Sequence, residues 1–374
     1  MSRATAVLVT GATGFVGREI VRRLLTAGRS VVALARDCEG LVAEDRVAAA
    51  TGVTPDGCRL AVIAGDFRDP VPVSDLARLR ATVDTVVHCA GDTTFFPEAF
   101  GPFRAGHVDG PRALLERLAA GRLRRWVQVS TAYVCGKRTG RVREDEGDIG
   151  QEFHNPYERV KLEAEAALRA AGAACGVEVS IVRPSIIVGP APATAGGAPA
   201  SLFFDFIRLA ASLARLAAGA GRPLRIAARP HARFNIVPID YVATASVALA
   251  GHPDAVSGTF HLVVSAAPTQ AAMLAMIAGR LGVGGLRLVD SREAVLADAS
   301  PLERRLARRL APYRAYLEQD VSFDDTRARA VLEARDVPPP TLGTTSVDRL
   351  IDWALTPDGR ARAGRPVSLA GVTA

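Results

Sequence analysis

The chain has 374 residues, of which 49% are hydrophobic and 23% are charged. The length predicts one large α/β unit with a smaller appended domain, and the composition is that of a soluble globular protein. The net charge of +7 comes from arginine, because Lys137 and Lys161 are the only lysines. Since no aromatic residues interleave with the basic ones, we expect no nucleic-acid binding. The positive charge is compatible with binding of an acidic partner protein or of a phosphate-bearing substrate.

Cysteine usage and hydropathy indicate the compartment. The cysteines are odd in number, well separated and without metal-ligand spacing, which argues against disulfides and against a metal site and favours a cytoplasmic location; they are Cys38, Cys58, Cys89, Cys135 and Cys175. The N-terminus enters a predicted strand within a few residues, so we expect no signal peptide. The most apolar predicted helix, 202–218, carries three charged residues, so we expect no integral membrane segment.

The first thirty residues have the pattern of a dinucleotide-binding unit. Residues 6–9 (AVLV) form a buried strand pattern, a glycine-rich turn follows, and apolar residues then recur at helical spacing up to Gly28. Glycines in this context allow a tight turn, a close backbone approach to the pyrophosphate and close packing of helix on strand. The predicted cofactor-binding residues of this turn are Gly11, Thr13, Gly14, Phe15, Val16 and Gly17.

The end of the second predicted strand, 30–35, bears on the choice of cofactor. Arg36 stands where an NAD-preferring site usually has an acid. Arginine pairs with a 2′-phosphate, so this position favours NADPH. Two alternatives remain: Arg36 is an ordinary surface arginine, or Asp37 takes the position of the acid and serves NAD.

The candidate catalytic group lies farther along the chain. A predicted strand ends in Ser130-Thr131, and Tyr157 and Lys161 open a later helix. Four residues apart on a helix, the last two share one face, where an ammonium group lowers the pKa of a phenol. We predict that Thr131 holds a substrate oxygen while Tyr157 protonates it as hydride reaches carbon. The alternative is a chance pair on a surface helix, but Lys161 is one of only two lysines, and arginine cannot replace a compact ammonium there.

These motifs together resemble the extended short-chain dehydrogenase/reductases, which implies a Rossmann-type doubly wound parallel sheet. The resemblance rests on TGATGFVG (10–17), HCAG (88–91), YERVK (157–161) and IVRPSIIVGP (181–190). Aligned through Gly136, the family's hydroxyl falls on Thr131 rather than Ser130. The resemblance adds further cofactor-binding residues, namely Asp66, Phe67, Cys89, Ala90, Gly91, Pro184, Ser185 and Ile187. His107 stands where the family usually has asparagine, and we interpret it as a structural replacement or a sign of an altered proton relay.

Within that superfamily the chain is most similar to the thioester-reductase and fatty-acyl reductase branch. The segments that carry this likeness are HCAGDTTFF (88–96), VSTAYVCGKRTG (129–140), NPYERVKLEAE (155–165) and FNIVPIDYVATA (234–245). The resemblance implies NADPH-dependent reduction of an acyl thioester, held on CoA or on a separate carrier protein, to an aldehyde or alcohol. The alternatives are a reductase of free ketones, aldehydes or hydroxysteroid-like substrates and a non-catalytic NADP-sensing regulator.

The second half is expected to hold most of a substrate domain. We place the Rossmann domain at 1–190, with return segments near 234–265, and the substrate domain mostly at 191–374, after a flexible connector at 191–199. Phe203, Phe204, Phe206 and Ile207 roof an acyl pocket or simply pack in a core. A basic amphipathic helix at 301–317, rich in arginine, docks an acidic carrier protein or CoA phosphates, or is a solvated face. Attachment to an anionic membrane is a third alternative.

Overall fold

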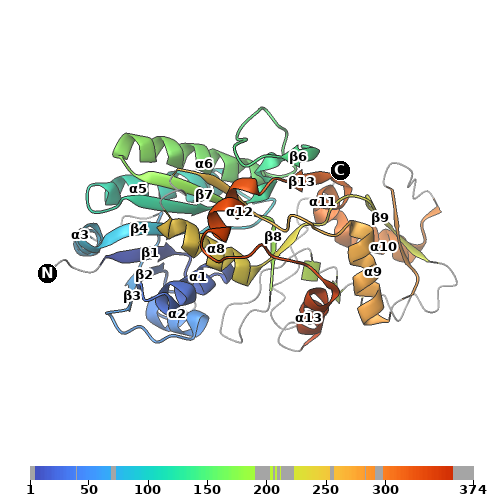
Figure 1. Cartoon of the computed structure of the whole chain (residues 1–374), viewed down its shortest axis with the longest axis horizontal. Helices are drawn as coiled ribbons and strands as arrows, with labels where there is room; N and C mark the ends of the chain where they lie inside the picture. The colour runs from blue at the N-terminus through green and yellow to red at the C-terminus, as the bar shows by residue number, and fades with distance from the viewer. Residues whose placement is uncertain are drawn as a thin grey trace.

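A seven-stranded parallel sheet forms the centre of the computed structural model (Figure 1), which describes residues 5–38, 40–68, 73–189, 223–252, 257–282, 284–290 and 298–356 and the single residues 203, 204, 207, 208 and 211. The strand order is β11-β7-β5-β4-β1-β2-β3, and every neighbouring pair is parallel. The strands are β1 (Ala6–Thr10), β2 (Ser30–Ala35), β3 (Leu60–Ala64), β4 (Val83–His88), β5 (Arg125–Val129), β7 (Glu178–Pro184) and β11 (Thr259–Leu262). The predicted doubly wound Rossmann sheet is thus confirmed, and its order reverses between β1 and β4.

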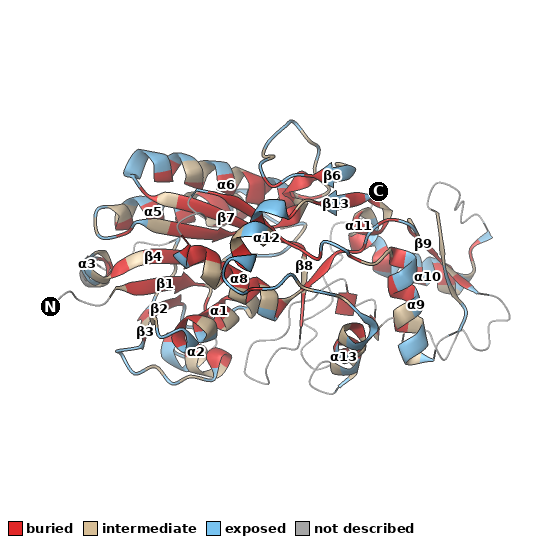
Figure 2. Cartoon of the chain, in the orientation of Figure 1, coloured by how far each residue is buried: buried red, intermediate tan, exposed pale blue. Residues whose placement is uncertain are grey.

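Helices cover both faces of this sheet (Figure 1). One layer holds α1 (Phe15–Thr26), α2 (Ala43–Thr51) and α8 (Ile239–Gly251), and the other holds α3 (Val73–Thr82), α5 (Gly110–Ala119) and α6 (Pro156–Cys175). Side chains alternate along β1: Val7 and Val9 pack into the first layer's core, whereas Leu8 packs into the second. The central strands are therefore buried on both faces, as Figure 2 shows.

Local sequence signals set the start and end of α6, the helix that carries Tyr157. The side chain of Asn155 accepts a hydrogen bond from the Glu158 backbone N–H at 3.0 Å, and Pro156 occupies the first helical position. Gly176 ends the helix in the left-handed conformation, at φ +68°. This N-cap fixes the first turn and therefore the place of Tyr157.

The second part of the molecule has its own core, built from short strand pairs and helices. The pairs of this core are β8 (Ile186–Val188) with β10 (Ile236–Pro238) and β9 (Leu224–Ala227) with β12 (Leu286–Val289). A further pair, β6 (Gly140–Val142) with β13 (Val321–Phe323), packs in a separate small cluster. The helices are α9 (Gln270–Leu281), α10 (Pro301–Leu310), α11 (Arg314–Glu318) and α13 (Thr344–Leu355), whereas α12 (Thr326–Glu333) packs beside α8 and β11. Figure 1 shows α9, α10 and α13 at one end of the sheet.

Two predictions about this part are wrong in detail. The segment from 234 was predicted to return to the main sheet, but β10 pairs with β8 instead, because Asn235 is held by Ser185 and Val264 before the strand begins. The main unit is rejoined by β11, which pairs with β7, and by α8 and α12, which pack into the core of the first layer. The basic helix predicted at 301–317 is broken between α10 and α11 by a 3-10 turn at Ala311–Tyr313, where Pro312 lacks a backbone donor.

Some predictions lie outside the described residues. These are the boundary at 190, the connector at 191–199 and the placement of Phe206. Phe203, Phe204 and Ile207 are described, and all three are buried in the second core, where the ring of Phe204 lies 4.8 Å from that of Trp353. Their burial favours a role in core packing over a role in lining an acyl pocket.

Candidate functional site

The glycine-rich turn after β1 leaves no room for larger side chains. Gly11 has φ +71°, and a Cβ atom on it would lie 2.7 Å from the Ala90 backbone nitrogen. A Cβ atom on Gly17 would lie 2.2 Å from the Gly11 carbonyl oxygen, and the Gly14 N–H donates to that same oxygen at 2.9 Å. The turn therefore packs against both α1 and the end of β4, in agreement with the packing expected of these glycines.

The N-terminus of α1 has the electrostatics of an anion site. Gly14 caps the helix without a side-chain hydrogen bond, and its first turn contains no acidic residue. The first backbone N–H groups, from Phe15 and Val16 onward, thus have no intrahelical acceptor, and they carry the positive end of the helix dipole. Thr13 precedes them in the turn. Arg18 adds a buried guanidinium 5.4 Å from the Phe15 ring. A dinucleotide pyrophosphate fits this site.

Sequence reasoning missed Arg18. It lies beside the last glycine of the motif, and the signal available was an arginine on the otherwise apolar first turn of a predicted buried helix.

A cluster of charged side chains lies where β2 and β3 end. Asp66 is bound by two arginines, with Arg68 Nη2 at 2.5 Å and Arg36 Nη1 at 3.5 Å from its Oδ2. The hydrogen bond from Arg68 holds the pKa of Asp66 below its usual value. Asp37 accepts a hydrogen bond from the Ala43 backbone N–H at 2.7 Å, at the start of α2. Arg36 itself is 61% exposed. Arg68 is a second cation that the sequence reading did not single out.

The other predicted cofactor residues follow the ends of β3, β4 and β7. Cys89 and Ala90 donate their backbone N–H groups to Thr10 at 3.2 and 3.4 Å, which holds the end of β4 beside the glycine turn. Phe67 follows β3 and packs edge-on against His88 at 5.0 Å. Gly91 comes two residues after Cys89, and Pro184, Ser185 and Ile187 span the step from β7 to β8. All lie toward the carboxyl edge of the sheet, where doubly wound folds bind their ligands.

The two hydroxyl residues after β5 have different partners. Ser130 donates to the buried Glu165 carboxylate at 2.5 Å, and Glu165 is ion-paired with the equally buried Arg183 at 2.6 Å. Thr131 Oγ1 accepts from the Tyr133 backbone N–H at 3.2 Å, an arrangement that leaves its own proton for another acceptor. The structure thus engages Ser130 in a buried network and leaves Thr131 as the better candidate to hold a substrate oxygen.

Tyr157 and Lys161 share one face of α6, as their spacing predicted. Lys161 Nζ lies 6.0 Å from the centre of the Tyr157 ring and donates to the Val129 carbonyl at 2.7 Å. Burial lowers the pKa of the Lys161 ammonium to about 8. Burial also raises the pKa of the Tyr157 phenol, and the charges of Asp92 and Glu158 raise it further. We expected a lowered pKa for Tyr157; the cost of desolvating a phenolate outweighs the ammonium here.

His107 is a neutral, buried imidazole beside Tyr157. It lies in a π-helical turn (Ala105–Asp109), and its Nε2 is 2.8 Å from the Asp92 carbonyl oxygen. Burial and the charge of Lys161 lower the pKa of His107 to about 4. Its ring is 6.0 Å from that of Tyr157 and 4.6 Å from that of Phe103. These contacts tie residues 91–95 to the site and agree with a structural replacement of asparagine.

A family model described as male sterility protein matches residues 9–246. The chain belongs to this NAD-binding family. It is therefore an extended short-chain dehydrogenase/reductase of the predicted branch and an oxidoreductase with a nicotinamide cofactor.

Similar proteins from larger assemblies agree with this family. The chain is 29% identical over 260 residues to the hybrid PKS-NRPS synthetase mycA of Thermothelomyces thermophilus, covering 63% of the chain and 6% of that protein. It is 26% identical over 295 residues to a carboxylic acid reductase of Mycobacterium tuberculosis, covering 70% and 25%. The chain thus spans a quarter or less of these two proteins. The terminal R domain of the myxalamid PKS-NRPS pathway has the same fold, with a TM-score of 0.74, 21% identity and coverage of 94% of this chain and 91% of that one.

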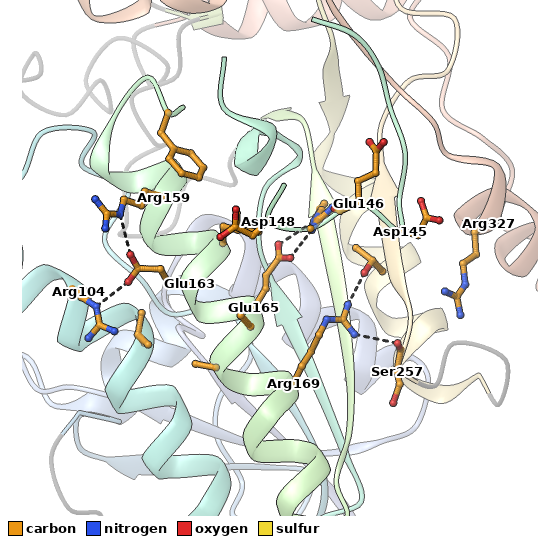
Figure 3. Close-up of a pocket in the computed structure, with 18 residues that line it drawn as sticks. Arg104, Asp145, Glu146, Asp148, Arg159, Glu163, Glu165, Arg169, Ser257 and Arg327 are labelled. Carbon is orange, nitrogen blue, oxygen red and sulfur yellow. Dashed lines mark hydrogen bonds and ion pairs between the residues drawn. The ribbon is translucent and has the colours of Figure 1, made fainter. Parts of the chain in front are cut away.

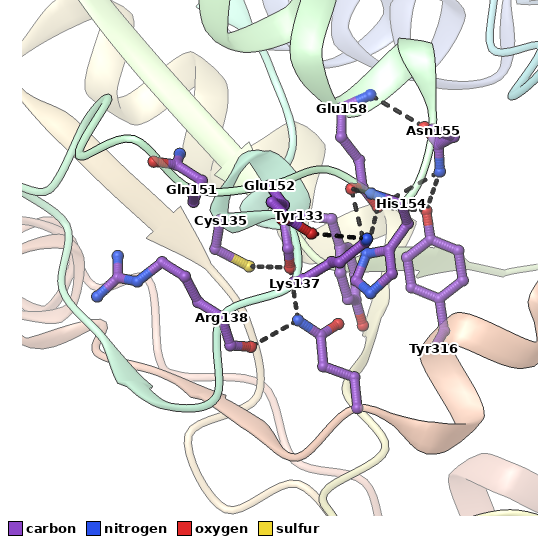
Figure 4. A network of polar contacts seen from close by, with 12 residues as sticks. Tyr133, Cys135, Lys137, Arg138, Gln151, Glu152, His154, Asn155, Glu158 and Tyr316 are labelled. Carbon is purple, nitrogen blue, oxygen red and sulfur yellow. Dashed lines mark hydrogen bonds and ion pairs between the residues drawn. The ribbon is translucent and has the colours of Figure 1, made fainter.

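In this member of the family, a buried network joins the start of α6 to the second part (Figure 4). The fully buried Glu158 accepts a hydrogen bond from the Tyr316 hydroxyl at 2.6 Å, and Asn155 donates to the same hydroxyl oxygen at 2.8 Å. The ring of Phe95 contacts Tyr316 at 5.7 Å and Tyr157 at 6.1 Å. The residue next to Tyr157 is thus bonded to α11, which lies 158 residues later in the sequence.

Two cavities flank α6. The larger, of about 880 Å³, is lined by ion pairs such as Arg104–Glu163 and Arg183–Glu165 and by Arg169 and Arg327, and none of the three candidate catalytic residues lines it (Figure 3). The smaller, of about 320 Å³, lies between α6 and the α10–α11 segment. The candidate site is therefore identified by its chemistry rather than by cavity size.

Within the described part of the chain, no three His, Cys, Asp or Glu side chains gather closely enough to hold a metal ion. None of the helices described there is long and apolar enough to cross a membrane.

Proposed function

We propose that this protein reduces a carrier-bound acyl thioester with NADPH, using Thr131, Tyr157 and Lys161. The observation that carries the proposal is their common place where β5 ends and α6 begins: Lys161 is bonded to the end of β5, Tyr157 lies one helical turn earlier, and Thr131 has a hydroxyl proton to donate. Membership of the family supports it, as do similarities to a PKS-NRPS synthetase and a carboxylic acid reductase.

The glycine turn and the start of α1 would hold the cofactor, which supplies a hydride when bound. Thr131 and Tyr157 hold the thioester carbonyl oxygen, and the phenol gives that oxygen its proton as the carbonyl carbon is reduced. The phenol is protonated at neutral pH, and the neighbouring Lys161 ammonium favours release of its proton in the reduction step. The resulting hemithioacetal loses its C–S bond, so that one thioester, one hydride and one proton give an aldehyde and a free thiol. Lys161 stays charged below about pH 8 and orients Tyr157.

The preference for NADPH over NADH rests on the charges after β2. Asp37, the residue that would serve NAD, already accepts the N–H group that opens α2. Arg36 and Arg68 instead present two guanidinium groups at this edge, and both are bound to Asp66. A 2′-phosphate is the group of the dinucleotide that two cations recognise here.

Parallel assays test this proposal. The protein is incubated with NADPH or NADH and with an acylated carrier protein, an acyl-CoA, or a free aldehyde or ketone, and nicotinamide absorbance and free thiol are followed. We expect thiol release that matches NADPH consumption, and loss of both in Tyr157→Phe. Activity confined to free carbonyls would identify a reductase of small carbonyl compounds instead.

A further inference from the structure

Helix α10 exposes an uncompensated row of arginines. Its buried side carries Glu303, Leu306 and Leu310, and the carboxylate of Glu303 is already bonded to Arg225 at 2.9 Å and closes the Ser300 capping box. The opposite side is exposed and holds four guanidinium groups, from Arg304, Arg305, Arg308 and Arg309. Over ten residues, or about 15 Å of helix, this side has four positive charges and no acidic residue.

Four other helices of this arginine-rich chain, α1, α5, α6 and α11, each hold an arginine that is paired with an acid one turn away. Such pairs are Arg23–Glu19, Arg112–Glu116, Arg159–Glu163 and Arg314–Glu318. On α10 the side chain of Arg304 is bonded to the Ala299 carbonyl, and no described acidic side chain forms an ion pair with Arg305, Arg308 or Arg309. An arginine-rich composition accounts for the number of arginines but not for the missing acids. The face therefore has the character of a surface for an anionic partner.

This face continues into the candidate site. The chain leaves α10 through Ala311 and Pro312 into α11, and these segments form one wall of the 320 Å³ cavity. The other wall is Phe96, His154 and Asn155, the last of which caps α6 two residues before Tyr157.

The lip of the cavity is aromatic. Phe96 is 56% exposed although it is a large apolar side chain. Its neighbour Phe95 contacts the Tyr157 ring at 6.1 Å and that of Tyr313 at 6.4 Å. The cavity thus lies between the arginine face and the proposed acid.

We propose that the exposed face of α10 docks an acidic carrier protein, whose thioester-bearing arm enters the cavity beside Phe96 toward Tyr157. This inference rests on the proposed function. Charge complementarity argues for the partner, since a row of arginines along the whole helix matches an acidic protein surface better than one phosphate group. A membrane surface is the poorer match, because all three leucines of α10 pack in the second core, Leu306 and Leu310 buried and Leu302 partly buried. Arginine and exposed aromatic residues are also the side chains that protein interfaces favour.

The test is a charge reversal with a matched control. The triple variant Arg305→Glu, Arg308→Glu, Arg309→Glu is compared with a triple variant of equal charge change on the exposed faces of α1, α3 and α5, made of Arg22→Glu, Arg78→Glu and Arg112→Glu. The substrates are an octanoyl-loaded acidic carrier protein, octanoyl-CoA and octanoyl-N-acetylcysteamine, a neutral thioester. Binding of the unacylated carrier is measured separately at low salt.

For the α10 variant we expect kcat/KM on the carrier to fall by about tenfold or more at low salt, through KM. Its activity on the neutral thioester and all activities of the control variant should stay within twofold. Added salt should lower the wild-type rate on the carrier and reduce the difference between variants. Unchanged kcat/KM and unchanged carrier binding in the α10 variant would refute docking, and a loss on octanoyl-CoA without a loss on the carrier would assign the face to CoA phosphates. If wild type reduces no thioester, the proposed function fails, and carrier binding alone decides the docking surface.

Discussion

Substitutions at the neighbouring residues Ser130 and Thr131 should have different effects, the first on the stability of the protein and the second on its catalytic rate. Ser130→Ala removes the 2.5 Å hydrogen bond to Glu165, but that carboxylate keeps its contacts to Arg183 at 3.0 and 2.6 Å. A hydrogen bond to a charged group contributes about 1.5–3 kcal/mol, so we expect a loss of that size in the free energy of unfolding. Activity should change little, because this hydroxyl faces the buried ion pair.

Thr131→Val should do the opposite. It removes an acceptor for the Tyr133 N–H, which costs about 0.5–1.5 kcal/mol of stability. It also removes the proposed donor to the substrate oxygen, and loss of one such donor lowers kcat by about 10²–10³. Denaturant unfolding followed by circular dichroism gives the first quantity, and NADPH oxidation with a thioester gives the second. If Ser130→Ala abolishes activity while Thr131→Val retains it, the assignment of the hydroxyl is wrong.

Three further outcomes test other parts of the site. kcat/KM for reduction should fall as pH rises through about 8, because Lys161 is charged below its lowered pKa and neutral above it. A kcat/KM that stays constant up to pH 9.5 would contradict the proposed role of the Lys161 ammonium in orienting Tyr157. Arg36→Ala should raise the KM for NADPH by about tenfold or more and leave that for NADH unchanged, since one charged hydrogen bond is lost; equal effects on both cofactors would place the 2′-phosphate elsewhere. Gly17→Ala puts a Cβ atom 2.2 Å from the Gly11 carbonyl oxygen, so thermal unfolding should show a loss of about 1–3 kcal/mol in the free energy of unfolding. Fluorescence titration should show no NADPH binding, and retained binding would mean that the turn can relax.

The parts of the fold that follow from local pattern were predictable. Residues 6–9 and 30–35 are apolar because parallel strands are buried on both faces, and the structure places β1 and β2 there. The glycine turn is equally local, since the close approach of Gly11 to Ala90 admits no side chain. The place of Tyr157 and Lys161 on one face of α6 follows from their spacing alone. Their chemical roles stay predictions.

What escaped the sequence reading depends on partners distant in the chain or on burial. The start of β10 is held beside the start of β8 by the hydrogen bond that Ser185 donates to Asn235, a contact between separate segments. The pKa of Tyr157 depends on its burial against separate segments that carry Phe95, Phe103 and His107, which no local motif encodes. Arg68 became visible as a candidate only when its ion pair with Asp66 was seen.

The bond between Glu158 and Tyr316 has a consequence for protein engineering. A chimaera that grafts onto this Rossmann unit a second part without a hydroxyl at the position of Tyr316 would leave Glu158 buried, with His154 and Asn155 as its remaining side-chain partners. A buried carboxylate that loses a partner is costly, and this one lies beside Tyr157. A chimaera designed to change the substrate range should therefore keep Glu158 and Tyr316 together as a pair. A library of chimaeras built without that constraint would select first for variants that restore a partner for Glu158.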